Sequence, residues 1–123
     1  MNDRVILYHI VSRERWEREA ASGVYRGDTL DSEGFIHCSL REQVLRVANE
    51  RFRGQSELVL LVIDSTRSTP ELRFENTEGG AELFPHIYGA LDLESVTAVL
   101  PFDPDDAGRF QRFPVEPSAS QHA

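Results

Sequence analysis

The sequence predicts a single α+β domain with a split, mixed or mostly antiparallel β-sheet and two main helices. At 123 residues the chain has the length of one compact domain. Both helical patterns lie in the first half of the chain and most strand patterns lie in the second. This segregation is typical of α+β domains. We expect the domain to cover residues 1–102, followed by an acidic, proline-rich segment at 103–123 whose end is disordered.

The chain begins with a strand and a helix. Residues 4–11, RVILYHIV, are apolar at nearly every position, which predicts a strand covered on both faces. Ser12 is a suitable cap for an amphipathic helix over 13–22, and Gly23 supplies the left-handed residue that ends it.

A second strand and helix follow a polar linker. Residues 35–39, FIHCS, alternate in the manner of a short strand. Ser39 precedes Glu42 by three positions, the spacing of a capping box, in which the two side chains bind backbone donors at a helix start. We therefore expect a helix from residue 40 that Gly54 ends.

The second half of the chain contains four further extended segments, at residues 57–64, 72–75, 84–91 and 95–102. The first of these, ELVLLVID, has the clearest pattern of a buried strand. Residues 76–83 carry adjacent glycines among polar residues, which predicts a flexible loop that could move over a ligand.

Composition limits the classes of partner. The formal charge of −8 disfavours nucleic acid and anionic membranes. The helical arginines Arg41, Arg46, Arg51 and Arg53 spread around the helix and predict a solvated surface. No apolar run reaches the roughly 20 residues of a membrane span, and no signal-peptide pattern opens the chain, so we expect a cytoplasmic protein that does not contact membranes.

Three histidines, His9, His37 and His86, lie in apolar, strand-like surroundings. Histidine titrates near neutral pH and binds metals, so a cleft that gathers them could support acid/base chemistry, ligand binding or zinc. The simpler interpretation is that each is partly buried and bonded to a backbone carbonyl. None has the paired spacing of a structural zinc site, although three ligands from distant strands remain an alternative.

The neighbours of His37 have simpler explanations. His37 and Cys38 are adjacent on a strand and point to opposite faces, so they do not readily share an ion or form a nucleophile pair. We expect Cys38 to be buried and inert. The helix cap explains Ser39, but the free N–H groups of a helix N-terminus could also hold an anion such as pyrophosphate.

Glu75 and Tyr88 complete the candidate cleft. Glu75 ends a predicted strand beside the glycine-rich loop, where a carboxylate could point into a cleft or form an exposed charge. Tyr88 lies two residues after His86 and shares its face, so it could stack on a ring or donate a hydrogen bond. No phosphate-binding glycine motif of the Walker or dinucleotide type is present.

The ordered motifs YHI, W, EGFIHCS, FE…GG and FPHIYG resemble a small uncharacterised bacterial and plant family, number 952 among the domains of unknown function. That family is similar in presumed fold to the ADP-ribosyltransferase superfamily. The resemblance implies that His9 holds the ribose of NAD, that His37 or Ser39 lies beside the nicotinamide, and that Glu75 aligns the ribose and supports developing charge. The glutamate pair of arginine-modifying toxins and the arginine quartet of RNA phosphotransferases have no counterpart.

These observations lead to one functional expectation with two alternatives. We expect NAD or a related nucleotide to bind a cleft in which Glu75 and His37 are catalytic and His9, Ser39, His86 and Tyr88 hold the ligand. The chemistry would be ADP-ribosyl transfer, to an acceptor that the sequence does not identify, or NAD hydrolysis. The alternatives are a non-catalytic module that binds a nucleotide or small anion, and a metal-dependent enzyme that uses His9, His37 and His86.

Overall fold

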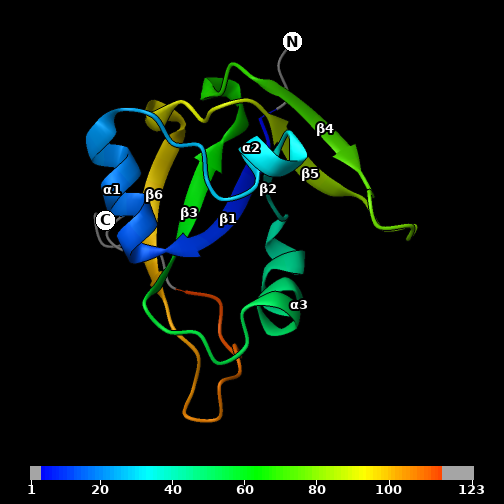
Figure 1. Ribbon diagram of the computed structural model, residues 1–123. Helices are drawn as coiled ribbons and strands as arrows, with labels where there is room; N and C mark the ends of the chain where they lie inside the picture. Colours follow the sequence, from blue (N-terminus) through cyan, green and yellow to red (C-terminus); the bar gives the residue numbers. More distant parts are fainter. Residues whose placement is uncertain (1–3, 115–123) are drawn as a thin grey trace, which may run out of the picture.

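The strands form two antiparallel, three-stranded sheets in a computed structural model that describes residues 4–114 (Figure 1). The first sheet has the order β1 (Ile6–Ser12), β3 (Leu58–Asp64), β6 (Val96–Phe102). The second has the order β2 (Ile36–His37), β5 (Phe84–Tyr88), β4 (Glu71–Glu75). All strand pairings among the described residues are antiparallel, so the predicted α+β class and split sheet are confirmed without any parallel pair.

The two sheets meet at one backbone bridge. The N–H of Tyr8 donates to the carbonyl of Ser39 over 2.9 Å, and the N–H of Ser39 donates to the carbonyl of Tyr8 over 2.7 Å. Away from this pair β1 and β2 separate. The bridge therefore marks the point at which one continuous sheet splits into two.

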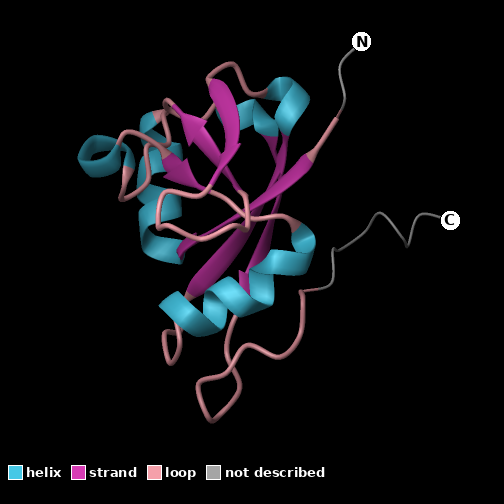
Figure 2. Cartoon of the chain, turned by 90° about the vertical axis from the view of Figure 1, so that its right-hand side faces the viewer, coloured by secondary structure: helices cyan, strands magenta, loops and turns pink. Residues whose placement is uncertain are grey.

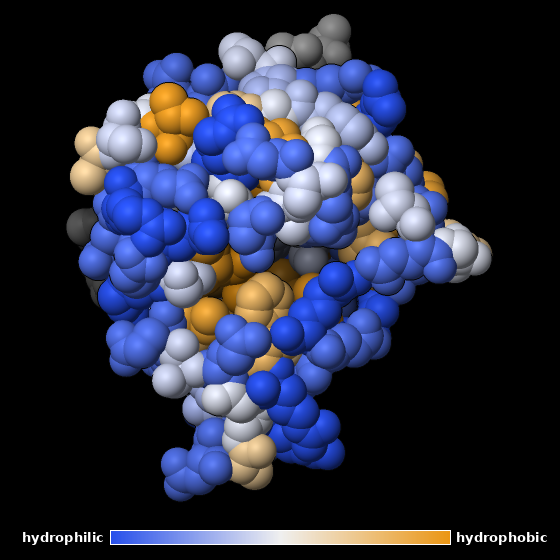
Figure 3. Space-filling model, viewed as in Figure 1, coloured by the Kyte–Doolittle hydropathy of each residue, from blue (hydrophilic) through white to orange (hydrophobic). Residues whose placement is uncertain are grey.

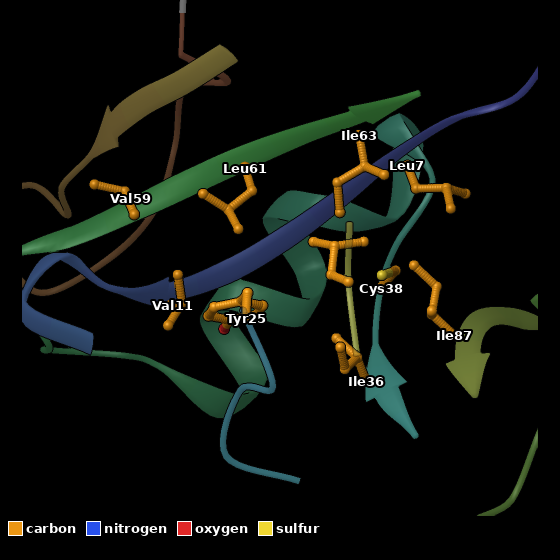
Figure 4. Packing of buried hydrophobic residues seen from close by; sticks show 10 residues of the cluster. Leu7, Val11, Tyr25, Ile36, Cys38, Val59, Leu61, Ile63 and Ile87 are labelled. Atoms are coloured by element: carbon orange, nitrogen blue, oxygen red, sulfur yellow. The ribbon is translucent and has the colours of Figure 1, made fainter. Parts of the chain in front are cut away.

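The first sheet is covered on both faces. Alternate residues of β1 and β3 pack against the second sheet and Tyr25, as Figure 4 shows for Leu7, Leu61 and Ile87. The other residues of the same strands pack against α3 and the C-terminal segment. Every residue of β3 is buried. The apolar runs that predicted covered strands are explained by these two clusters.

The first helix follows the prediction. α1 (Arg13–Ser22) begins after Ser12, whose Oγ accepts the N–H of Arg15 over 3.1 Å, and ends at Gly23 with φ 94°. The predicted polar linker contains a short additional helix, α2 (Leu30–Glu33). Two 3₁₀ turns, Ser65–Arg67 and Leu93–Ser95, complete the helical elements that the structure describes. No helix within residues 4–114 has the length and apolar composition needed to cross a membrane.

The start of α3 (Arg41–Arg51) corrects the predicted capping box. Leu40, one residue after the predicted cap, occupies the N-cap, and its N–H donates to Oε1 of Gln43 over 2.9 Å. In a capping box the N-cap N–H donates to the glutamate side chain, but the N–H of Ser39 donates instead to the carbonyl of Tyr8. The pairing of Ser39 with Glu42 was therefore wrong by one residue at each position.

The chain after β6 returns to the core. The ring of Phe110 is 2% exposed and packs on the face of the first sheet that α3 covers. Asn49 of α3 pairs with both backbone groups of Phe110, accepting its N–H over 2.8 Å and donating to its carbonyl over 2.9 Å. The predicted boundary at residue 102 thus falls inside the packed chain. The predicted disordered end lies outside the described residues. Figure 2 shows the strands in the middle of the folded molecule and the helices at its periphery.

Candidate functional site

A cavity of about 530 Å³ opens where the two sheets separate. It is lined by parts of β1, β2, β5 and α3 and by the segments 28–33 and 76–84. Figure 3 shows the hollow near the centre of this face, with apolar surface visible inside a hydrophilic rim. A volume of this size suits a small-molecule ligand. Four of the six predicted site residues line it: His9, His37, Ser39 and His86.

His86 is the most firmly oriented of these side chains. It lies on β5, its residue exposure is 2%, and its ring stacks on Phe35 with 4.1 Å between ring centroids. Its Nδ1 lies 2.9 Å from Oε2 of Glu75. Since a carboxylate only accepts, Nδ1 carries the proton and donates. In the neutral form of a ring with this tautomer, Nε2 is an acceptor.

The Nε2 atom of His86 is available to a ligand. It makes no hydrogen bond within residues 4–114. Over the same residues the only buried side-chain nitrogen or oxygen that lacks a partner and is sealed from solvent is Oγ of Ser68. Nε2 of His86 is not one of these sealed atoms, and His86 lines the cavity.

Glu75 and Tyr88 lie behind His86 and are not among the cavity-lining residues. The antiparallel register explains this arrangement, because Glu75 pairs with Phe84 and sits diagonally from His86 on the same face of the sheet. The hydroxyl of Tyr88 donates to the same Oε2 that binds His86. Hydrogen bonds from Tyr88 and from His86 lower the pKa of Glu75. Glu75 therefore acts on the cavity only indirectly, through its hydrogen bond to the His86 ring.

His9 uses both ring nitrogens within the protein. Its Nδ1 donates to the carbonyl of His37 over 2.6 Å, and its Nε2 accepts from the hydroxyl of Tyr25 over 2.6 Å. Burial lowers the pKa of His9 below 6.5, against the opposing hydrogen bond to His37 and the carboxylates of Asp28 and Glu19. His9 lines the cavity as a neutral side chain without a free nitrogen. No local sequence signal indicated Tyr25, which lies in a loop.

His37 and Ser39 face the cavity with more freedom. His37 pairs with His86 across β2 and β5, with 5.2 Å between ring centroids, and its Nε2 lies 3.0 Å from Oε1 of Glu33. Ser39 is 5% exposed, and its Oγ makes no hydrogen bond to the described residues. This hydroxyl is a second free polar group in the cavity.

The expected anion site at the start of α3 receives no support. The residues of α3 that line the cavity belong to its C-terminal half, from Arg46 to Arg51, and none of residues 40–43 does. Ser39 and the helix N-terminus therefore do not form one combined anion site.

Within residues 4–114 no group of three or more histidine, cysteine or acidic side chains has the geometry of a metal site. His9 could join a site with His37 and His86 only by giving up a hydrogen bond. Cys38 points into the core beside Ile36 and Ile87 (Figure 4). Burial raises the pKa of its thiol to about 12, in agreement with the expected inert cysteine.

Charged side chains surround the cavity unevenly. Two guanidinium groups, those of Arg46 and Arg51, line it together with five carboxylates, those of Asp28, Glu33, Glu50, Glu78 and Glu82. The sequence predicted that these arginines are solvated, and about half of each side chain is indeed exposed. It did not predict that they line the cavity.

The glycine-rich loop, residues 76–83, lies at the edge of this cavity and is held to α3 by two ion pairs. Glu82 pairs with Arg46, and Glu78 pairs with Arg51. Inside the loop, Oδ1 of Asn76 accepts the N–H groups of Glu78 and Gly80 over 2.8 and 3.1 Å. The predicted loop over a ligand is thus an ordered turn held to α3 by ion pairs.

Comparison with known proteins identifies related sequences and structures. A family model described as "Protein of unknown function (DUF952)" matches residues 10–99. The crystal structure of protein CC0527 from Caulobacter crescentus is 38% identical, covers 87% of this chain and 94% of its own, and superposes with a TM-score of 0.77. The solution NMR structure of CC0527 covers 86% and 91% with a TM-score of 0.73. No curated protein matches.

Proposed function

The chain belongs to the DUF952 family of proteins of unknown function, and we propose that its cavity binds NAD or a related nucleotide, with His86 as the acid/base group for transfer or hydrolysis of the ADP-ribosyl group. The proposal includes an ADP-ribosyltransferase-like relationship for the split sheet. The observation that carries the catalytic part is the His86 ring, buried and oriented by Glu75 and Phe35, with Nε2 free at the cavity.

The chemistry follows from the orientation of that ring. Nε2 of His86 takes a proton from water or from an acceptor hydroxyl as its oxygen attacks the anomeric carbon of the ribose. The bond between ribose and nicotinamide breaks, and nicotinamide leaves as a neutral molecule because its ring was cationic in NAD. Hydrolysis therefore yields ADP-ribose, nicotinamide and one proton, which His86 holds and then releases to solvent.

The surrounding groups suit this ligand. Five carboxylates around the cavity favour the cationic nicotinamide ring and the positive charge that develops on the ribose. In the proposed complex, the hydroxyl of Ser39 and the ring of His37 contact ribose hydroxyls. His9 supports the site by holding β1, β2 and Tyr25 together.

Glu75 takes a different role from the one the resemblance implies. It does not line the cavity, so we assign it as a positioning residue that fixes the His86 tautomer and stabilises the imidazolium. Tyr88 in turn orients the Glu75 carboxylate.

The test is nicotinamide release from NAD by the wild type and by matched variants. Asparagine at position 86 keeps a donor near the place of Nδ1 and removes Nε2, so His86→Asn should lower kcat by about a hundredfold to ten thousandfold and preserve binding of ADP-ribose. Glu75→Gln should lower kcat less and preserve binding of ADP-ribose, because the amide oxygen still accepts from Nδ1 while the imidazolium loses its anionic partner. Glu71→Gln, four residues earlier on the same strand, is the control.

The outcomes separate the functional classes. Binding of NAD without nicotinamide release in any form of the protein would indicate the non-catalytic nucleotide module. Release that survives in His86→Asn would remove His86 from the chemistry. Absence of binding to NAD and to ADP-ribose by calorimetry would overturn the proposal as a whole.

A further inference from the structure

The segment 76–82 crosses the cavity edge on two ion pairs with α3. Nη1 of Arg46 donates to Oε1 of Glu82 over 2.8 Å, and its Nη2 donates to the other carboxylate oxygen, so this pair is bidentate. Nη2 of Arg51 donates to Oε2 of Glu78. All four side chains line the cavity.

These ion pairs are exposed to solvent and therefore weak. The side chains of Arg46 and Glu82 are 45% and 41% exposed, and those of Arg51 and Glu78 are 47% and 63% exposed. Pairs with this exposure contribute little to stability, because water and salt screen the attraction. Another anion can replace the Glu78 carboxylate at small cost. Displacement of Glu82 also breaks the hydrogen bond that its carboxylate accepts from Nε2 of Gln43, although this amide keeps its bond to the carbonyl of Leu83.

The same arginines are the cavity's only guanidinium groups within the described residues, and no lysine occurs in the sequence. A guanidinium binds phosphate oxygens through parallel N–H donors, as it binds a carboxylate. The N-terminus of α3 does not line the cavity, so it offers phosphate no alternative there. The two arginines are about half exposed and lie at the mouth of the cavity. His86 is 2% exposed and lies at its inner end.

We propose that Arg46 and Arg51 form a phosphate subsite, in which the pyrophosphate group of the ligand displaces the carboxylates of Glu82 and Glu78 from the two guanidinium groups. The inference rests on the proposed nucleotide function and adds the orientation of the ligand. The phosphates lie at the mouth beside α3, and the ribose and base that take part in the chemistry point toward His86. Glu78 and Glu82 hold the arginines in place when the ligand is absent and compete with it for them.

The subsite predicts opposite effects for the two partners of each pair. Arg46→Gln and Arg51→Gln should each raise the Kd for ADP-ribose and for inorganic pyrophosphate about tenfold, since a charge-assisted hydrogen-bond partner is lost. Glu82→Gln and Glu78→Gln should each lower both Kd values by about threefold, because a competing anion is removed. Adenosine, which has no phosphate, should bind all variants equally.

Calorimetry with these three probes at fixed ionic strength is the measurement, with thermal melting to confirm folding. Arg18→Gln and Glu14→Gln are matched controls, because they alter an Arg–Glu pair of the same kind on α1, outside this cavity. Both controls should leave every Kd within about twofold, which shows that net charge alone is not responsible.

Three results would be decisive. Affinities for ADP-ribose and pyrophosphate that fall in both the arginine and the glutamate variants would make the ion pairs structural supports and overturn the subsite. ADP-ribose binding that ignores all four substitutions would overturn the subsite and leave the proposed function standing. Arg46-dependent pyrophosphate binding without binding of NAD, ADP-ribose or adenosine would retain the subsite and reject the nucleotide function.

Discussion

His9 and His86 differ in the use of their second ring nitrogen, and this difference assigns them separate roles. His9 bonds to a backbone carbonyl and to the Tyr25 hydroxyl, so it joins three segments of the chain. His86 bonds only to Glu75 and keeps Nε2 for the cavity. Substitutions at the two positions should therefore have different consequences, loss of stability at His9 and loss of activity at His86.

Stability should decrease in acid because His9 is neutral in the folded protein. Its folded pKa lies below 6.5, so its contribution is complete above pH 6.5 and is lost as the pH falls toward the folded value. Asp28, Glu19, His37 and Tyr25 face this ring and are unchanged in a His9→Gln variant. Urea unfolding between pH 7.5 and 5.5 should show a slope smaller in the variant by up to about 1.4 kcal/mol per pH unit. Equal slopes would contradict the buried neutral His9.

Cys38 should react slowly with thiol reagents. Burial raises its pKa to about 12, so almost no thiolate is present at pH 8. Alkylation by iodoacetamide, followed by mass spectrometry, should be roughly a hundredfold or more slower in the folded protein than in urea. Comparable rates would place the thiol at the surface and reopen a nucleophilic role.

At the level of single residues the sequence predicted which side chains gather but not what each does. His9, His37, Ser39 and His86 do line one cavity. Their roles depend on hydrogen bonds to Tyr25 and Glu75, which the fold brings close across 16 and 11 positions of sequence. A local sequence pattern cannot predict partners that are so far apart in the chain.

Among the elements, α3 contributes to the core, to the cavity and to the attachment of the C-terminal segment. One face packs Val44 and Ala48 on the first sheet, its C-terminal half lines the cavity, and Asn49 anchors the returning C-terminal segment. The last contact involves both backbone groups of Phe110, a residue that is 2% exposed.

Removal of the Asn49 side chain should weaken this attachment. Asn49→Ala leaves the N–H and carbonyl of Phe110 without partners in a buried position, at a cost of about 2 kcal/mol in the free energy of unfolding. Gln111→Ala, which alters an exposed neighbour of Asp105, is the control and should change stability by less than about 0.5 kcal/mol. Urea denaturation measures both. Equal stability of the wild type and Asn49→Ala would show that residues 103–114 are not part of the cooperative unit.

Element prediction succeeded where local chemistry decides the boundary. α1 begins and ends where Ser12 and Gly23 indicated, because both signals act within a few residues. α3 begins one residue late because the bridge between Ser39 and Tyr8, a long-range contact, overrides the capping pattern. The turn α2 was missed because four residues are too few to show helical periodicity.

In the whole molecule, the separation of the two sheets connects the fold with the site. The apolar cluster between the sheets fixes their relative position, and the single bridge from Tyr8 to Ser39 leaves room for the cavity beyond it. In β2 and β5 the strand alternation then directs Ile36 and Ile87 to the core and His37 and His86 to the cavity. The sequence contains this alternation, but not the distance at which the sheets separate.

The most direct test of the proposed site is a titration with ADP-ribose followed through the ¹⁵N signals of the histidine rings. His86→Asn assigns the signals of His86. We expect the Nε2 signal of His86 to move in a saturable manner, with a smaller change at His37, while both nitrogens of His9 keep their signals. Movement at His9 with none at His86, or no change at saturating ADP-ribose, would contradict a nucleotide cavity centred on His86.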